Sequence, residues 1–213
     1  MRYQINKHQL AIISPLVMVL ACHLVARIGS SVMSKWAFIP VILTLWLVAF
    51  IFLRPLQIDT YRMWFRKNKG NTIWKVLIIF VGILPLPVFL LHWQTLSTWQ
   101  VILPYVVIAL VNPFVEEMYW RGLLLDNLRN WKNWQAVLYT SLFFALNHPL
   151  SFGMFSKLNS GLTVFISTFI MGTVWGFGYK KIGNLRLIIF SHFLVDTFNL
   201  SVPAFLDLYE SKW

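Results

Sequence analysis

The chain has 213 residues, of which 58% are hydrophobic and only 12% charged, and it includes 11 tryptophans and 18 phenylalanines. A soluble domain of this size needs far more polar surface, so the composition excludes a soluble globular protein and predicts a membrane protein. The formal net charge of +11, from 18 Lys and Arg against seven Asp and Glu, is typical of the positive-inside rule and does not indicate a nucleic-acid partner.

Hydropathy predicts an all-α fold, a polytopic membrane helix bundle of about seven spans. In chain order the predicted spans are 9–28, 36–53, 73–92, 98–114, 134–150, 161–179 and 185–202. Several of these runs approach the ~20 apolar residues that cross a bilayer. We expect one membrane domain without a cleaved signal peptide, because the first run lacks a small-residue cleavage site and further spans follow it.

Basic residues alternate between the predicted loops and give the orientation. The most basic loop runs from Arg54 to Lys75 and is predicted to be cytoplasmic, where it would also contact anionic lipid headgroups. Its basic residues are Arg54, Arg62, Arg66, Lys67, Lys69 and Lys75. Arg2 and Lys7 then also fall inside, so we expect a multi-pass protein of the cell membrane with a cytoplasmic N-terminus.

Ionisable side chains inside membrane spans are costly and usually mark a functional site. Four of the seven acids lie at predicted span ends or in loops, where a solvated charge needs no further explanation: Asp59, Asp126, Asp207 and Glu210. The acids within spans are Glu116, Glu117 and Asp196, and the histidines to be considered with them are His148 and His192.

The stretch NPFVEEMYWRG carries two of these acids. Pro113 suits the first turn of a helix, which predicts a break near Asn112 and a new helix over 114–128. On that helix Glu117 and Arg121 are four residues apart, so they are expected to form a structural salt bridge. Glu116 points about 100° away and is therefore free for chemistry.

Two further motifs supply partners. In FFALNHP, Phe144 and His148 share one helix face, and in SHFLVDTFNL the residues His192, Asp196 and Asn199 form one polar stripe. Counting residues from the predicted span ends places Glu116, His148 and His192 at a common depth of roughly 12–13 Å in the cytoplasmic half.

Such a set, which lacks a good nucleophile, is typical of amide hydrolysis by water. Glu116 would act as the base, His148 would orient the water, and His192 with a neighbour would stabilise the oxyanion. The sequence contains no HExxH, GxGD or GxSG motif of the other intramembrane protease classes.

The three motifs EExxxR (Glu116, Glu117, Arg121), FxxxH (Phe144, His148) and HxxxD (His192, Asp196) resemble, in order and separation, those of the CPBP family, the CAAX proteases and bacteriocin-processing enzymes. The resemblance implies a helical intramembrane endopeptidase with Glu116, His148, His192 and residue 196 as catalytic residues. Glu117, Arg121, Asn199 and Phe144 would support them. We expect N-terminal spans with the basic loop over 1–99, a catalytic core over 100–202 and a C-terminal tail over 203–213.

Several alternatives stay open at this point. In CAAX-cleaving members the last motif position is often Asn, an amide donor, whereas Asp196 donates only when protonated; it would otherwise hold His192 while Asn199 or water donates. We favour an enzyme that needs no cofactor, although Glu116, His148 and His192 are the ligand set for zinc if a metal is used.

The expected substrate is a hydrophobic or lipidated, for example prenylated, peptide, cleaved in CAAX-type or bacteriocin-related processing. The rival function is a bacteriocin self-immunity membrane protein that acts by binding or by proteolysis. A transporter or proton channel is the third possibility, but it would need polar groups through the full membrane depth.

Overall fold

The computed structural model describes residues 7–67 and 70–209, and its regular secondary structure is helical. The α-helices are α1 (Lys7–Met33), α2 (Phe38–Leu53), α3 (Ile58–Trp64), α4 (Thr72–Ile83), α5 (Leu86–His92), α6 (Trp99–Glu117), α7 (Leu125–Asn127), α8 (Asn133–Ser151), α9 (Gly161–Ile182), α10 (Arg186–Phe198) and α11 (Ser201–Phe205). Within these ranges there is no strand, which confirms the predicted fold class. The basic residues Arg2 and Lys69, and Glu210 with them, lie outside the described residues.

Among the described residues, four helical stretches are long and apolar enough to cross a membrane: His8–Leu53, Thr72–Thr95, Trp99–Asn127 and Gly161–Ile182. The chain is therefore a multi-pass membrane protein, but the predicted count of about seven spans is not confirmed. The predicted spans 134–150 and 185–202 fall on α8 and α10. These two helices carry polar side chains of the candidate site, and α10 has only 13 residues, so neither reads as a uniform apolar span.

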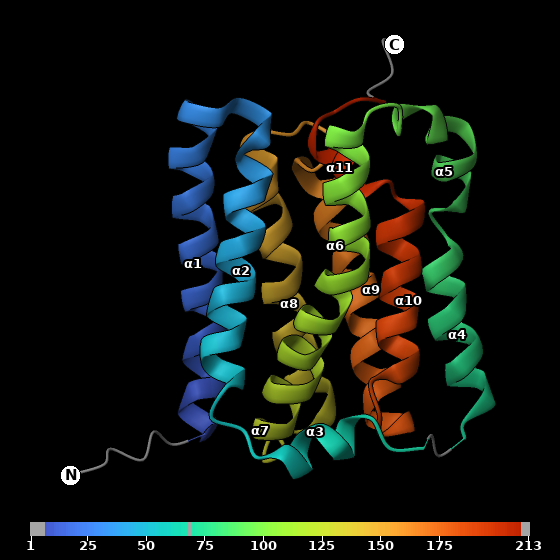
Figure 1. The fold of residues 1–213 in the computed structure, drawn as a ribbon. Coiled ribbons are helices and arrows are strands. Elements are labelled where there is room, and N and C mark those ends of the chain that lie inside the picture. The colour runs from blue at the N-terminus through green and yellow to red at the C-terminus, as the bar shows by residue number, and fades with distance from the viewer. Residues whose placement is uncertain (1–6, 68–69, 210–213) are drawn as a thin grey trace.

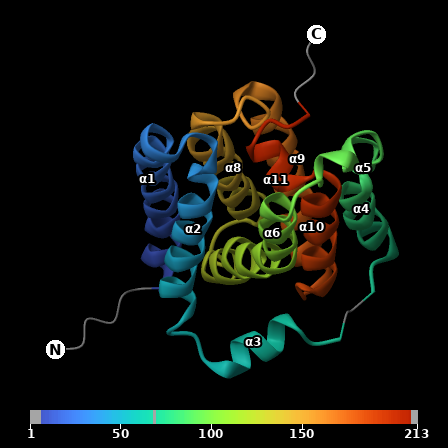
Figure 2. The ribbon, with the colours of Figure 1, turned by 45° about the horizontal axis from the view of Figure 1, so that its top comes forward.

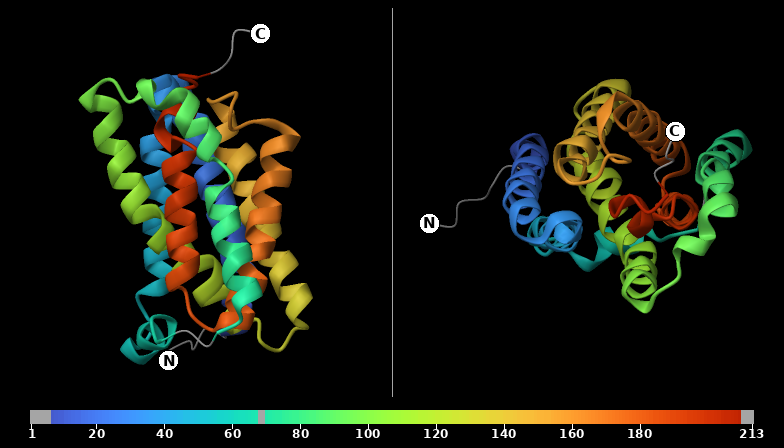
Figure 3. Two further views of the ribbon diagram at one scale, coloured as in Figure 1. Left: turned by 90° about the vertical axis from the view of Figure 1, so that its right-hand side faces the viewer. Right: turned by 90° about the horizontal axis from the view of Figure 1, so that it is seen from above.

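The long helices run side by side along one axis (Figure 1). α10 packs against α4 on one side and α6 on the other, and α8 packs against α1 and α9. Views from the side and from above agree that α10 lies beside α6 (Figure 3). α3 lies across one end of the bundle instead of within it (Figure 2).

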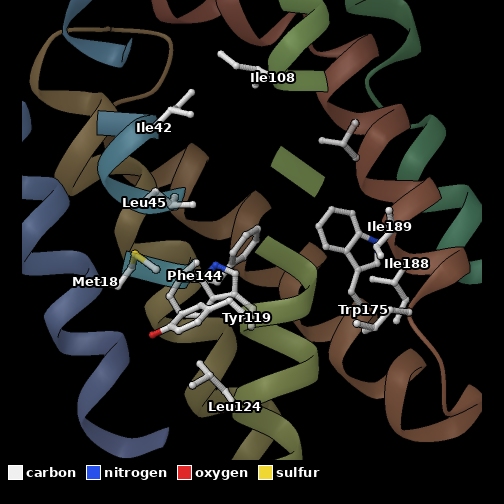
Figure 4. Packing of buried hydrophobic residues seen from close by; sticks show 14 of the residues in the cluster. Met18, Ile42, Leu45, Ile108, Tyr119, Leu124, Phe144, Trp175, Ile188 and Ile189 are labelled. Carbon is white, nitrogen blue, oxygen red and sulfur yellow. The ribbon is translucent and has the colours of Figure 1, made fainter. Parts of the chain in front are cut away.

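Two glycines explain how closely α8 and α9 pack. A Cβ atom on Gly176 would come within 2.9 Å of Val137 Cγ1, and one on Gly172 would come within 3.1 Å of Phe144 Cδ1. This small-xxx-small spacing on α9 is the arrangement that lets membrane helices approach when burial from water no longer drives them together. The buried Phe144 ring lies in the middle of the bundle (Figure 4), with its centroid 6.2 Å from that of Trp175.

The predicted helix break near Asn112 is wrong. α6 continues through Pro113 to Glu117, and the helix then widens into a π-helix over Met118–Leu124 before α7. A membrane helix tolerates an internal proline when its neighbours satisfy the freed backbone group. The irregularity therefore falls one turn later, directly after the two glutamates, and π-turns are frequent at functional sites.

Two of the acids expected to be solvated charges are instead partnered. Asp126 accepts hydrogen bonds from Trp64 Nε1, at 2.8 Å, and from the Tyr179 hydroxyl, at 3.0 Å, which tie α3 and α9 to α7. Asp207 has a side chain only 1% exposed and forms an ion pair with Lys35 Nζ at 3.0 Å. Their partners come from distant segments, and the sequence pattern around each acid does not reveal them.

Candidate active site

The predicted salt bridge between Glu117 and Arg121 is present and fully buried. Arg121 Nη1 donates to Glu117 Oε1 at 2.7 Å, and the two side chains are 1% and 0% exposed respectively. The Arg121 guanidinium also lies over the rings of Phe144, at 4.4 Å, and Trp175, at 5.2 Å. Cation–π contacts of this kind strengthen where water is excluded.

His192 joins this pair from α10. Its Nδ1 lies 2.7 Å from Glu117 Oε1, and because a carboxylate accepts, we assign the proton to Nδ1. Its ring stacks on Trp175 with centroids 4.8 Å apart. Glu117 is therefore shared between Arg121 and His192, a second role that the sequence interpretation did not include.

The other imidazole nitrogen of His192 faces the remaining two acids. Nε2 lies 3.7 Å from Glu116 Oε2 and 3.6 Å from Asp196 Oδ1. Both distances exceed hydrogen-bonding length, so neither acid is committed to His192 in the way that Glu117 is. Glu116 and Glu117 thus differ as predicted: one carries two strong bonds and the other lies beside the histidine without one.

A second contact joins α6 to α10 one turn away. Asn112 Nδ2 donates to Asp196 Oδ2 at 3.3 Å, and Trp46 Nε1 on α2 donates to Asn112 Oδ1 at 3.0 Å. Sequence reasoning missed both residues as parts of the site. Asn112 carried a signal, because it is a polar residue one helical turn before Glu116; Trp46 carried none, since its partner is 66 residues away.

His148 reaches the site from α8 through aromatic contacts. Its Nδ1 donates to the Phe144 carbonyl oxygen at 3.0 Å, which leaves Nε2 as the acceptor nitrogen. The Phe144 ring lies 5.1 Å from the His148 ring and 6.2 Å from the His192 ring. All three motifs therefore meet at Phe144, although among the described residues no hydrogen bond or ion pair links His148 to Glu116.

Three buried atoms of the cluster have no hydrogen-bond partner among the described protein atoms: Glu116 Oε2, Glu117 Oε2 and Arg121 Nη2. Leaving a buried polar atom unpaired costs about 1–3 kcal/mol, more for a charged one. Native proteins leave few such groups, and those that persist commonly mark chemistry. The cluster has the polarity and the spare hydrogen-bonding capacity of a reaction site.

Asn199 occupies a different position from the other members of its stripe. It caps the end of α10, where its N–H donates to Val195 O at 2.8 Å and its carbonyl accepts from the Tyr209 hydroxyl at 2.8 Å. Its side-chain amide forms no hydrogen bond with any described residue. A side-chain amide that does contact an acid of the site is that of Asn112, at 3.3 Å from Asp196.

The zinc alternative meets an incomplete ligand set. Across residues 7–67 and 70–209, no three His, Cys, Asp or Glu side chains are grouped so as to hold a metal ion. Of these candidate ligands, Glu116 Oε2 and His192 Nε2 lie 3.7 Å apart, while the His148 ring contacts Phe144.

Residues 97–198 match the family model described as Type II CAAX prenyl endopeptidase Rce1-like. No curated protein sequence and no solved structure matches the chain. The matched segment begins just before α6, ends with α10, and contains every residue of the three motifs. Residues 97–198 of this membrane chain therefore form an Rce1-like domain of the type II CAAX prenyl endopeptidase family, a protease family, as the motifs predicted.

Proposed function

We propose that the chain is an intramembrane endopeptidase in which Glu116 activates water for peptide hydrolysis. The observation that carries this proposal is the unequal state of the two glutamates. Glu117 is held by Arg121 and His192, each at 2.7 Å, while the buried Glu116 Oε2 has no hydrogen-bond partner among the described residues. A carboxylate that is buried but not bonded is suited to take a proton from water.

The reaction follows from the roles of the surrounding atoms. Water oxygen attacks the scissile carbonyl carbon while Glu116 takes one water proton and His148 Nε2 accepts a hydrogen bond from the same water. The tetrahedral oxyanion collapses, the carbon–nitrogen bond breaks, and the proton on Glu116 passes to the leaving amine. In its imidazolium form His192 would donate Nε2–H to the oxyanion, since its Nδ1–H is given to Glu117.

The proposed substrate is a hydrophobic or prenylated peptide presented from the bilayer, in CAAX-type or bacteriocin-related processing, with the N-terminus of the enzyme in the cytoplasm. Support comes from the family description, which names prenyl endopeptidases, and from the membrane setting of the site. The exposed basic residues of α3 and its flanks, Arg54, Arg62 and Arg66, suit the cytoplasmic, anionic face of a cell membrane.

The test is a mass-spectrometric digest of farnesylated and unprenylated hydrophobic peptides by detergent-purified protein, with and without a strong zinc chelator. We expect cleavage that survives the chelator and disappears in Glu116→Gln. The matched control is Asp59→Asn, which removes an exposed acid paired with Arg62 at 3.2 Å and is expected to cleave normally. Cleavage by Glu116→Gln would contradict the role of this residue, and loss of cleavage in chelator would favour a zinc enzyme.

His148→Ala and His192→Ala separate the two histidines within this proposal. Each is expected to lower kcat by roughly 10²–10⁴-fold, the usual contribution of a positioned acid–base or oxyanion group. Full turnover by either variant would remove that residue from the reaction. In a producing cell, protection against a bacteriocin that persists in Glu116→Gln would support the immunity alternative acting by binding.

A further inference from the structure

The proposed reaction needs hydrogen-bond donors for the oxyanion, and α10 supplies too few. When Asp196 is ionised its carboxylate can only accept, and in that state it offers no donor. Its Oδ2 already accepts from Asn112 at 3.3 Å, and its Oδ1 lies 3.6 Å from His192 Nε2. His192 is then the single donor of the HxxxD motif, whereas oxyanion sites commonly use two.

The side-chain amide of Asn112 is held in one orientation. The Trp46 indole N–H can only donate, so the atom 3.0 Å from it must be the carbonyl oxygen of the amide. That fixes Nδ2 toward Asp196, and reversing the amide would oppose a donor to a donor and an acceptor to an acceptor. Nδ2 carries two hydrogens, and among the described residues only Asp196 accepts one of them.

The register of α6 and α10 places this amide next to the base. Asn112 and Glu116 are one turn apart on α6, and Asp196 and His192 are one turn apart on α10. The helices face each other in two rungs, Asn112–Asp196 at 3.3 Å and Glu116–His192 at 3.7 Å. Successive rungs are about 6 Å apart, so a peptide carbonyl lying between them is within reach of both.

A third contact joins the same two helices. The Tyr105 hydroxyl, two turns before Asn112 on α6, donates to the Thr197 carbonyl oxygen on α10 at 2.9 Å. Asn112 is also only half-buried, unlike the buried Glu116.

We propose that Asn112 is a catalytic residue that donates its second Nδ2 hydrogen to the oxyanion, with Trp46 and Asp196 as the groups that orient it. This inference rests on the proposed peptidase function. Asp196 thus acts as an acceptor that positions a donor on the neighbouring helix, and the amide of the site is carried by α6 instead of α10.

The first test measures kcat and KM of Asn112→Ala on whichever farnesylated or unprenylated peptide the wild type cleaves. We expect kcat to fall by about 10²–10³-fold with KM nearly unchanged, the effect of removing one oxyanion donor. The matched control, Asn127→Ala, removes a half-buried asparagine whose amide donates to Leu123 O at 2.8 Å. It is expected to retain wild-type kcat.

The second test exchanges the two side chains and guards against a purely structural effect. Asn112→Asp places two carboxylates together and should be inactive, while the double variant Asn112→Asp/Asp196→Asn restores one amide and one carboxylate. Trp46 can donate to either residue at position 112, so the pair can re-form. We expect the double variant to recover at least about tenfold in kcat over Asn112→Asp, with melting in detergent measured for each protein.

The outcomes separate this inference from the proposed function. Wild-type kcat in Asn112→Ala beside an inactive Glu116→Gln would overturn the role of Asn112 alone. No recovery in a double variant that melts like the wild type would also overturn it. Cleavage by Glu116→Gln, or no cleavage of either peptide class by the wild type, would overturn the peptidase proposal and this inference with it.

Discussion

Two buried acid clusters in this molecule differ in how completely their oxygens are used. At the end of the bundle where α11 lies, Asp207 receives the Ser156 hydroxyl at 2.7 Å and Lys35 Nζ at 3.0 Å. It also receives the backbone N–H groups of Lys157 and Leu158, both at 3.0 Å. In the middle of the bundle, by contrast, Glu116 and Glu117 each keep a buried oxygen without a hydrogen-bond partner among the described residues.

The difference separates a structural acid from a reactive one. Asp207 closes a loop: it fixes the chain after α8, holds Lys35, and adopts a left-handed backbone (φ 52°) that Asp tolerates better than most residues. In the central cluster, buried carboxylate oxygens without hydrogen bonds lower the stability of the fold. Proteins keep such groups mainly where the chemistry of a site requires them. Variants at Arg121, Asp207 and Gly172 test this contrast.

Arg121→Ala should have the largest effect on stability. Among the described residues it leaves the buried Glu117 carboxylate with His192 as its one hydrogen-bond partner, and it removes the cation over the Phe144 ring. Breaking a buried ion pair from one side costs roughly 3–5 kcal/mol. Thermal melting in detergent should fall steeply and activity should be lost. Wild-type melting would show that the pair contributes nothing.

Asp207→Asn should cost about 1.5–3 kcal/mol at neutral pH, because hydrogen bonds to a charged group are lost. Although partial burial raises the pKa of Asp207, the Leu158 N–H, the Ser156 hydroxyl, Lys35 and the Lys157 N–H together hold that pKa below its ordinary value. The unfolded-state pKa is about 3.9. The stabilisation is therefore fully present above roughly pH 4–5 and is lost as pH falls through the folded-state pKa.

The corresponding measurement is the difference in melting temperature between wild type and Asp207→Asn across pH 3 to 7, a window set by that pKa. The difference should shrink on acidification, and turnover at neutral pH should be unchanged in protein that remains folded. A pH-independent difference would mean that the Asp207 charge does not stabilise the fold.

Gly172→Ala should have the smallest effect on stability, about 1 kcal/mol. The added Cβ would lie 3.1 Å from Phe144 Cδ1 and 3.2 Å from Arg121 Nη2, so those side chains must shift by a few tenths of an ångström. Because Phe144 contacts both histidine rings, we expect kcat to fall even in protein that remains folded. Unchanged kcat would show that the position of the Phe144 ring is not critical.

The spacing of residues in the sequence predicted the arrangement of side chains that lie on the same helix. The Glu117–Arg121 pair, the different direction of Glu116, and the His192–Asp196 stripe all follow from neighbours one turn apart, and each is found in the structure. The common depth assigned to Glu116 and His192 agrees with their 3.7 Å separation. The three-part division of the chain stays a prediction.

The spacing of residues in the sequence did not predict contacts between distant segments. The Trp46–Asn112–Asp196 chain joins three helices, and the four donors to Asp207 come from two segments far from it in sequence. The π-turn at Met118–Leu124 replaces the break expected at Pro113, because neighbouring helices decide where a membrane helix deforms. Hydropathy did not settle the number of spans, because α8 and α10 carry polar residues of the site.

The central claim is that adjacent glutamates have different functions, and the most direct measurement compares Glu116→Gln with Glu117→Gln for both peptide cleavage and melting in detergent. We predict that Glu116→Gln abolishes cleavage and melts at or above the wild-type temperature, because it removes an unbonded buried carboxylate. Glu117→Gln should lower melting markedly, since it leaves Arg121 unpaired. Cleavage retained by Glu116→Gln, or equal melting of the two variants, would contradict this account.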